Sequence, residues 1–184
     1  QFNKTAKMIK KKMLLIHLSI LGLLFLNLLF FSVSGITLNN TVKLSIKIAF
    51  FISGFIAFFF YLKPFTKLSL YFSYFVIGPI IGFFAWLADG IMGAIVISFY
   101  FWILPESEVY SNNDYIIYSK TGGPLSIGMQ YELYQKLGLF EIKIGKIQSN
   151  NILQENPDNI KIIHKKHDLI IYNKDSIIFT KYLN

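Results

Sequence analysis

The sequence contains no cysteine and no arginine among its 184 residues. Without cysteine the chain has no disulfide, no thiolate-ligated metal cluster and no thiol nucleophile. Arginine is the side chain that binds phosphates and base edges in bidentate fashion. Its absence argues against a nucleic-acid partner in spite of the formal net charge of +8.

Acidic residues are scarce in the first part of the chain. Residues 1–104 hold nine lysines but a single acid, Asp89, whereas residues 105–184 hold nine lysines and nine acids. The excess of positive charge therefore belongs to the part that also carries the hydrophobic runs. Lysines that flank apolar runs orient membrane-spanning helices, so we interpret this charge as a topology signal.

Apolar runs that can cross a membrane fill the first part of the chain. The run from Met13 follows five lysines and is too long for a signal peptide, whose apolar region has about 7–15 residues, so we interpret it as an uncleaved anchor. The run from Leu68 to Leu104 exceeds one span and contains a single polar turn signal, Asp89-Gly90, which predicts a helical hairpin. We predict about four spans, at 13–34, 45–62, 68–87 and 90–104. A re-entrant last segment, giving three spans, is the alternative.

The lysines also predict the orientation of the spans. Five precede the first run, and Lys63 and Lys67 follow the second, while Lys43 and Lys47 lie on the other side. The positive-inside rule then places the N-terminus in the cytoplasm of a multi-pass protein of a cell (inner) membrane. Four spans put the C-terminal part in the cytoplasm, which is our expectation, and three put it outside.

Three polar residues are candidate intramembrane sites: His17, Asn27 and Asp89. Ionisable groups inside a membrane are functional candidates by default. The simpler interpretation puts His17 near the headgroups, gives Asn27 a hydrogen bond to another helix, and assigns Asp89 to a turn. Small or kinking residues mark candidate helix-packing or hinge positions. These are Gly78, Pro79, Gly82, Gly90 and Gly93.

After Pro105 the hydrophobic period changes to two, which is typical of half-buried strands. We predict a small antiparallel all-β domain over 105–184, a meander or barrel-like, after the membrane α-helical bundle of 1–104. The most clearly patterned hairpin has Leu133 opposite Ile142 and Glu132 opposite Lys143. Residues 106–113 are interpreted as a polar linker. The predicted strands are 115–119, 129–134, 140–145, 160–164, 169–172 and 177–182.

Two short motifs in this domain have a simple structural interpretation. His164 and His167 flank a pair of lysines, but two ligands are too few for zinc and the lysines oppose a cation, so an exposed turn is favoured. The glycine-rich stretch at 121–124 is neither a P-loop nor a dinucleotide fingerprint. We expect no catalytic residue, no metal and no cofactor, and hence a protein that is not an enzyme.

No residue motif assigns the chain to a specific family. In architecture it resembles two bacterial groups, the small multi-span immunity proteins and the defence effectors in which a compact β-barrel senses a nucleotide signal. The likeness implies a bacterial membrane protein with a role in defence or immunity, and no site residue is carried over from it.

The leading hypothesis is a non-enzymatic signalling or defence effector whose β domain binds a ligand or partner and controls the helices. Alternatives are an immunity or interaction protein acting against a membrane-targeting toxin, an assembly subunit of a membrane complex, and an ion pathway through Asp89 and His17. The expected partners are the lipid bilayer, a second copy or another membrane protein, and a small ligand at the β domain.

Overall fold

The chain divides into two compact units that are not contiguous in sequence. One comprises Gln1–Leu29 and Asn40–Pro105, and the other comprises Phe30–Asn39 and Glu106–Asn184. We call them the helical unit and the β unit. The computed structural model describes residues 2–87, 105–121, 129–147, 159–165, 168–174 and 176–182.

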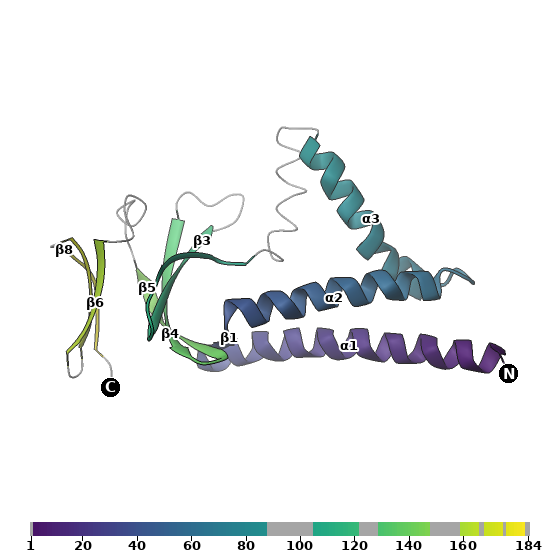
Figure 1. Cartoon of the computed structure of the whole chain (residues 1–184), viewed down its shortest axis with the longest axis horizontal. Coiled ribbons are helices and arrows are strands. Elements are labelled where there is room, and N and C mark those ends of the chain that lie inside the picture. The colour runs from purple at the N-terminus through teal and green to yellow at the C-terminus, as the bar shows by residue number, and fades with distance from the viewer. Residues whose placement is uncertain are drawn as a thin grey trace. The chain divides into compact units, whose positions relative to one another are not determined.

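Three long helices are present in the described part of the chain (Figure 1). They are α1 (Phe2–Ser34), α2 (Asn40–Tyr61) and α3 (Lys67–Leu87). All three are long and apolar enough to cross a membrane, because about 20 residues of helix match the 30 Å hydrocarbon core. The prediction of four helices is off by one, and the predicted fourth segment, 90–104, lies outside the described residues.

The surfaces of these helices are strongly apolar. Leu15, Leu70 and Phe30 are each more than 60% exposed, and many other large hydrophobic side chains are exposed as well. Apolar exposure on this scale marks a surface that contacts lipid or another protein. The helices are therefore compatible with a multi-pass membrane protein.

Helices α2 and α3 approach each other closely at Gly54. This glycine is buried, and a Cβ atom there would lie 2.5 Å from the ring of Phe75 in α3. Phe75 forms the centre of a small core with Phe50, Ala57 and Phe72, and α1 contributes Leu14, Ile20 and Leu24 around it. Small residues at such contacts allow membrane helices to pack tightly.

Eight strands form two antiparallel sheets within the described residues, which confirms the predicted all-β class. The five-stranded sheet has the order β1-β5-β4-β3-β2 and the three-stranded sheet has the order β6-β7-β8, so the strands do not form a single barrel-like sheet. Strand β2 occupies part of the segment interpreted as a linker. The strands are β1 (Ile36–Leu38), β2 (Ser107–Ser111), β3 (Tyr115–Thr121), β4 (Met129–Leu137), β5 (Phe140–Ile147), β6 (Ile160–Lys165), β7 (Asp168–Asn173) and β8 (Ser176–Tyr182).

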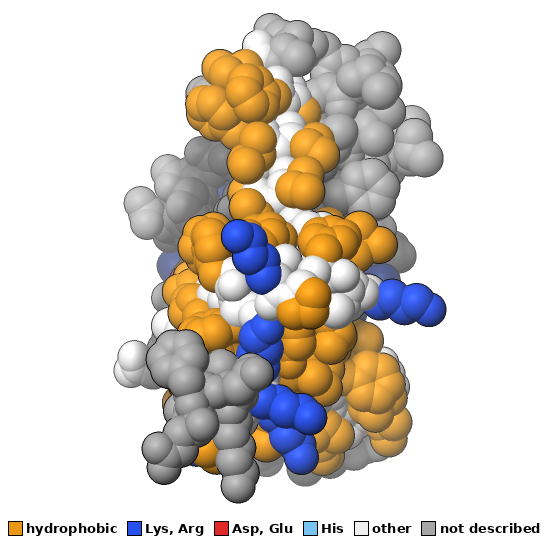
Figure 2. Space-filling view, turned by 90° about the vertical axis from the view of Figure 1, so that its right-hand side faces the viewer, with side chains coloured by type: hydrophobic (Ala, Val, Ile, Leu, Met, Phe, Trp, Pro, Cys, Tyr) orange, Lys and Arg blue, Asp and Glu red, His pale blue; other side chains and the backbone are white. Residues whose placement is uncertain are grey.

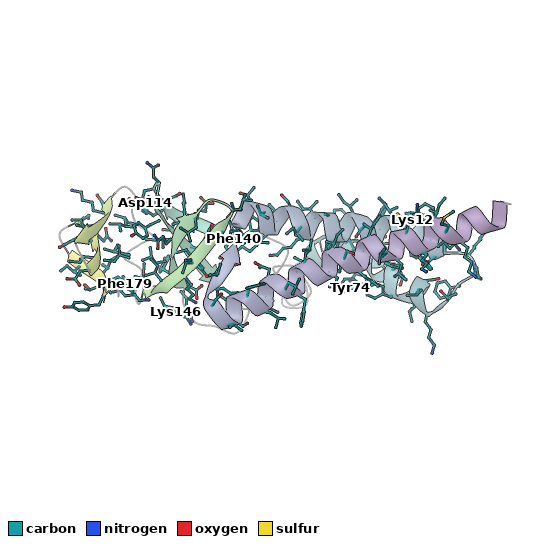
Figure 3. The ribbon with its side chains drawn as sticks, turned by 90° about the horizontal axis from the view of Figure 1, so that it is seen from below. Lys12, Tyr74, Asp114, Phe140, Lys146 and Phe179 are labelled. Carbon is teal, nitrogen blue, oxygen red and sulfur yellow. The ribbon has the colours of Figure 1, made fainter. Side chains whose placement is uncertain are left out.

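The core of the β unit lies between the two sheets. Ile117 and Leu133 from the larger sheet pack with Leu169 and Ile171 from the smaller one, and all four are fully buried. Side chains fill the space between the sheets in the view from below (Figure 3). Gly145 of β5 leaves room for the Phe179 ring, which would lie 2.8 Å from a Cβ at that position.

The β4–β5 hairpin forms, but its predicted register is wrong. Leu133 pairs with Gly145 and Tyr134 with Lys143, and a bulge separates the two pairs. The strands run on to a two-residue turn in which Gly138 has a φ of 63°, and the extra residue of the bulge shifts the pairing beyond it. Glu132 and Lys143 still form an ion pair, now along a diagonal.

The close α2–α3 contact predicts a large effect of a side chain at Gly54. We expect Gly54→Val to lower the free energy of unfolding in detergent by about 1–3 kcal/mol, since an overpacked interface must shift or strain. Gly22→Val in α1 is the matched control, because no atom lies within 4 Å of a Cβ there. Equal losses in the two variants would contradict the close contact.

Candidate functional site

Strand β1 inserts the connection between α1 and α2 into the β unit. Gly35 ends α1 with a φ of 71°, a left-handed conformation that glycine adopts without strain. The following three residues pair antiparallel with β5, so that Ile36 lies opposite Ile142 and Leu38 opposite Phe140. Helix α2 begins two residues after Leu38. A single residue therefore separates β1 from each helix.

Backbone hydrogen bonds hold both ends of β1. The Lys143 amide donates to the Gly35 carbonyl, and the Asn39 amide donates to the Leu139 carbonyl, each over 2.9 Å. The Asn39 side chain also donates from Nδ2 to the Gly138 carbonyl over 3.3 Å. The connection between the helices is thus tied to β5 and to the β4–β5 turn.

A buried polar network covers the face of the larger sheet that points away from the smaller sheet. Glu132 and Glu141 are almost fully buried. The Tyr118 hydroxyl donates to Glu141 Oε1 and the Tyr134 hydroxyl donates to Glu132 Oε2, each over 2.7 Å. Lys143 forms an ion pair with Glu132. Charges buried in this way are stable only when they are paired and hydrogen-bonded.

The network continues to the end of α1. The Lys143 Nζ atom lies 5.7 Å from the centre of the Phe31 ring, in cation–π geometry. Phe31 also packs against the buried group formed by Ile116, Tyr118 and Tyr134. One set of contacts therefore runs from the last turn of α1 into β5, β4 and β3.

The two tyrosines of this network are hydrogen-bond donors over the physiological pH range. Burial raises the pKa of Tyr118 and Tyr134 far above the usual value of 10. Their hydrogen bonds to Glu141 and Glu132 raise the pKa further, because a carboxylate opposes a second negative charge beside it. The hydroxyl groups thus remain protonated, and each donates a hydrogen bond to one oxygen of its carboxylate.

His17 lies at the meeting point of all three helices. Its Nδ1 atom is 2.9 Å from Ser53 Oγ in α2, and its Nε2 atom is 2.8 Å from the Tyr71 hydroxyl in α3. Ser53 already donates its hydroxyl proton to the Phe50 carbonyl over 2.8 Å, so Ser53 accepts from Nδ1–H. Nε2 then accepts from Tyr71. This assignment makes His17 a neutral imidazole with both nitrogens satisfied.

Aromatic rings enclose this histidine. The Phe50 ring stacks on it with a centroid distance of 4.6 Å, and Phe72 and Phe75 meet it edge-on at 5.2 and 5.1 Å. The side chain is 0% exposed. A group enclosed in this way is suited to fixing three helices together and not to receiving a substrate from solvent.

The remaining predicted positions that the structure describes do not join the His17 group. Asn27 is half-buried in α1 and has an interaction partner, but about 15 Å of helix separates it from His17. In α3, Gly78 is buried, Pro79 is exposed and Gly82 is half-buried. Asp89, Gly90, Gly93 and His167 lie outside the described residues.

Sequence reasoning missed the partners of His17 and the role of β1. Ser53-Gly54, two small residues inside an apolar run, is a signal for a close helix contact that would have pointed to α2. Ile36-Thr37-Leu38, bounded by Gly35 and Asn39, has the composition of a short strand. Nothing local indicates which strand it pairs with.

Comparisons with known protein families, with curated proteins and with solved structures find no match to this chain. Functional inference therefore depends on the geometry of the chain itself. Among the described residues, no three His, Cys, Asp or Glu side chains are grouped so that they could hold a metal ion. The β1 connection and the His17 group are the two sites that the described residues build.

The hydrogen bonds of His17 predict a specific role for one hydroxyl group. Tyr71→Phe removes the donor to Nε2 and leaves a buried acceptor unsatisfied, so we expect a loss of about 1 kcal/mol in unfolding free energy. The matched control is Tyr74→Phe, one turn along α3, where the ring meets Phe75 edge-on with a centroid distance of 5.5 Å. Denaturation of both variants in the same detergent compares them. Equal effects would rule out the proposed donor role.

The raised pKa values of Tyr118 and Tyr134 predict alkaline sensitivity of the β unit. Because the folded state holds these protons more tightly than the unfolded state, their contribution is complete below about pH 10 and is lost as the pH rises above it, by about 1.4 kcal/mol per pH unit for each group. Denaturant unfolding at a series of alkaline pH values measures this slope. We expect Tyr118→Phe/Tyr134→Phe to flatten it. Tyr182→Phe, at a side chain that is 76% exposed, is expected to leave it unchanged.

Proposed function

We propose that this chain is a non-enzymatic membrane protein whose β unit binds a ligand or partner and transmits its state to α1 and α2 through β1. The observation that supports this most directly is the pairing of β1 with β5, with one residue between β1 and each helix. A device that couples binding to helix position needs a short, firmly held connection of this kind.

The proposed transmission follows from the mechanics of this connection. If a ligand favours a different position of β5, then β1 moves with it, because its backbone hydrogen bonds hold both of its ends. A single-residue connection cannot absorb that movement, so the ends of α1 and α2 must follow. A ligand has this effect only if it binds the two arrangements with different affinities.

A non-catalytic role is consistent with how the polar side chains are used. His17 is enclosed by aromatic rings, and Glu132 and Glu141 accept hydrogen bonds from tyrosines inside the β unit. A bacterial cell (inner) membrane is part of the proposal, on account of the three long apolar helices. Their exposed apolar surfaces would accommodate lipid, a second copy or another membrane protein.

An immunity or interaction protein that acts within the membrane, or an assembly subunit, is the alternative. In such a protein the helices alone would carry the activity, and the β unit would need no firm connection to them. The hydrogen bonds at both ends of β1 favour the coupled arrangement.

If the two units are coupled, destabilising the β unit should speed hydrogen–deuterium exchange at the start of α2. Leu133→Ala opens a cavity at a fully buried position and is expected to cost about 2–5 kcal/mol in the β unit. We expect faster hydrogen–deuterium exchange in β3–β5 and also in residues 40–45. Leu137→Ala is the control, being the same change in the same strand at a side chain that is 49% exposed.

A second background separates coupling from general destabilisation. Replacing residues 35–39 by alternating glycine and serine weakens the pairing of β1, because glycine and serine are poor strand formers. Leu133→Ala should then alter exchange at 40–45 much less than in the unmodified chain. If exchange at 40–45 is unaffected by Leu133→Ala in the unmodified chain while the β strands exchange faster, the β unit does not act on the helices and the proposal fails.

A further inference from the structure

We infer that the β unit lies on the side of the membrane opposite the lysine-rich end of α1, outside the cytoplasm, and takes its ligand or partner from there. This deepens the proposed function, on which its second clause rests, by naming the compartment that is sampled.

Paired strands must lie in the same compartment. Their backbones are about 5 Å apart, whereas the hydrocarbon core is about 30 Å thick, and lipid does not tolerate an open sheet edge. Strand β1 pairs with β5, and β5 belongs to the five-stranded sheet. The connection between α1 and α2 therefore lies on the same side of the membrane as the β unit.

Helix α1 separates that connection from its own lysines. Residues 13–34 lie between Lys12 and Gly35 without a charged side chain, and as helix they extend for about 33 Å, enough for one crossing. If α1 crosses, then β1 and the whole β unit lie across the membrane from Lys12.

Helix α2 returns to the lysine side, and hydrogen bonds support this. The Lys10 side chain donates from Nζ to the Lys63 carbonyl over 2.8 Å, and the Tyr61 hydroxyl donates to the Lys10 carbonyl over 3.0 Å. The α2–α3 connection is thus bound to the lysine-rich part of α1. Lysine side chains lie among hydrophobic ones at this end (Figure 2).

Charge identifies which side is the cytoplasm. Of the nine lysines in residues 1–104, seven lie at the end where Lys10 meets Lys63, and only Lys43 and Lys47 lie at the β1 end. The positive-inside rule assigns the end with seven lysines to the cytoplasm. The β unit is then outside.

The inferred topology differs from the sequence-based expectation of a cytoplasmic domain after four spans. A β unit on the side of β1 requires an odd number of crossings before Pro105, and α1, α2 and α3 supply three. An external domain has access to envelope proteins and extracellular molecules. A cytoplasmic nucleotide, which the architectural likeness suggested, would not reach it.

The absence of cysteine makes the topology directly testable by single-cysteine labelling of the full chain. Asn113→Cys lies in the exposed bend between β2 and β3, and Phe65→Cys lies in the α2–α3 connection, where the side chain is 66% exposed. We expect a membrane-impermeant maleimide to label Asn113→Cys equally in intact and lysed bacterial spheroplasts. We expect it to label Phe65→Cys only after lysis.

A cross-linking measurement tests the premise separately. Ile36→Cys/Ile142→Cys and Leu38→Cys/Phe140→Cys join directly opposed residues, whose separation permits a disulfide. The same four positions in exchanged combination, Ile36→Cys/Phe140→Cys and Leu38→Cys/Ile142→Cys, are diagonal and about 7–8 Å apart. We expect oxidation to cross-link the opposed pairs and not the exchanged ones.

Several results would overturn the inference. If Asn113→Cys is labelled only after lysis, the β unit lies in the cytoplasm. If both cysteines are labelled from outside, no membrane crossing separates them. If all four pairs cross-link equally, the β1–β5 register is wrong. The two labelling results leave the effect of Leu133→Ala on exchange at 40–45 unaltered, so the compartment can fail while the coupling stands. Loss of the register removes the β1–β5 pairing on which both depend.

Discussion

The backbone pairing of β1 with β5 is the interaction on which the organisation of this protein depends. Gly35 and Asn39 each donate or accept a hydrogen bond across it, so three residues between two long helices become the edge of a five-stranded sheet. A loop of the same length without these bonds would leave the β unit attached only through Pro105. With them, the β unit is joined to the chain at two places, and one of these places is the connection between α1 and α2.

Both units bury polar side chains, and in both the buried groups make specific hydrogen bonds. In the helical unit, His17 bonds to Ser53 and Tyr71. In the β unit, tyrosines donate to Glu132 and Glu141, and Lys143 compensates charge. Such networks specify one arrangement of their elements, because any other arrangement leaves a buried polar atom unsatisfied. This explains how a chain so rich in exposed apolar side chains can still define specific helix and strand contacts.

Local sequence patterns predicted much of the fold because the hydrophobic pattern of a segment reflects whether it forms a membrane-spanning helix or a half-buried strand. The apolar runs predicted the regions of α1, α2 and α3, and the period-two pattern predicted β3 to β8 within a few residues. The pattern did not predict the β4–β5 register, since the strands extend to a two-residue turn and a bulge beside Leu133 then adds one more residue, and alternation reveals neither. It also missed β2, because residues 106–113 were interpreted as a polar linker, and β1, where three residues are too few to show a period.

The sequence by itself determined the elements: helices long enough to span a membrane, strands that alternate, and a net positive charge confined to residues 1–104. His17 was identified as a candidate because an ionisable residue inside an apolar run can be recognised from the local sequence, without knowing its partners. Only the tertiary structure decided its partners, because Ser53 and Tyr71 are 36 and 54 residues away along the chain. The same holds for β1 and β5, which are about a hundred residues apart. Contacts at such separations depend on the packing of whole elements, and no local pattern records them.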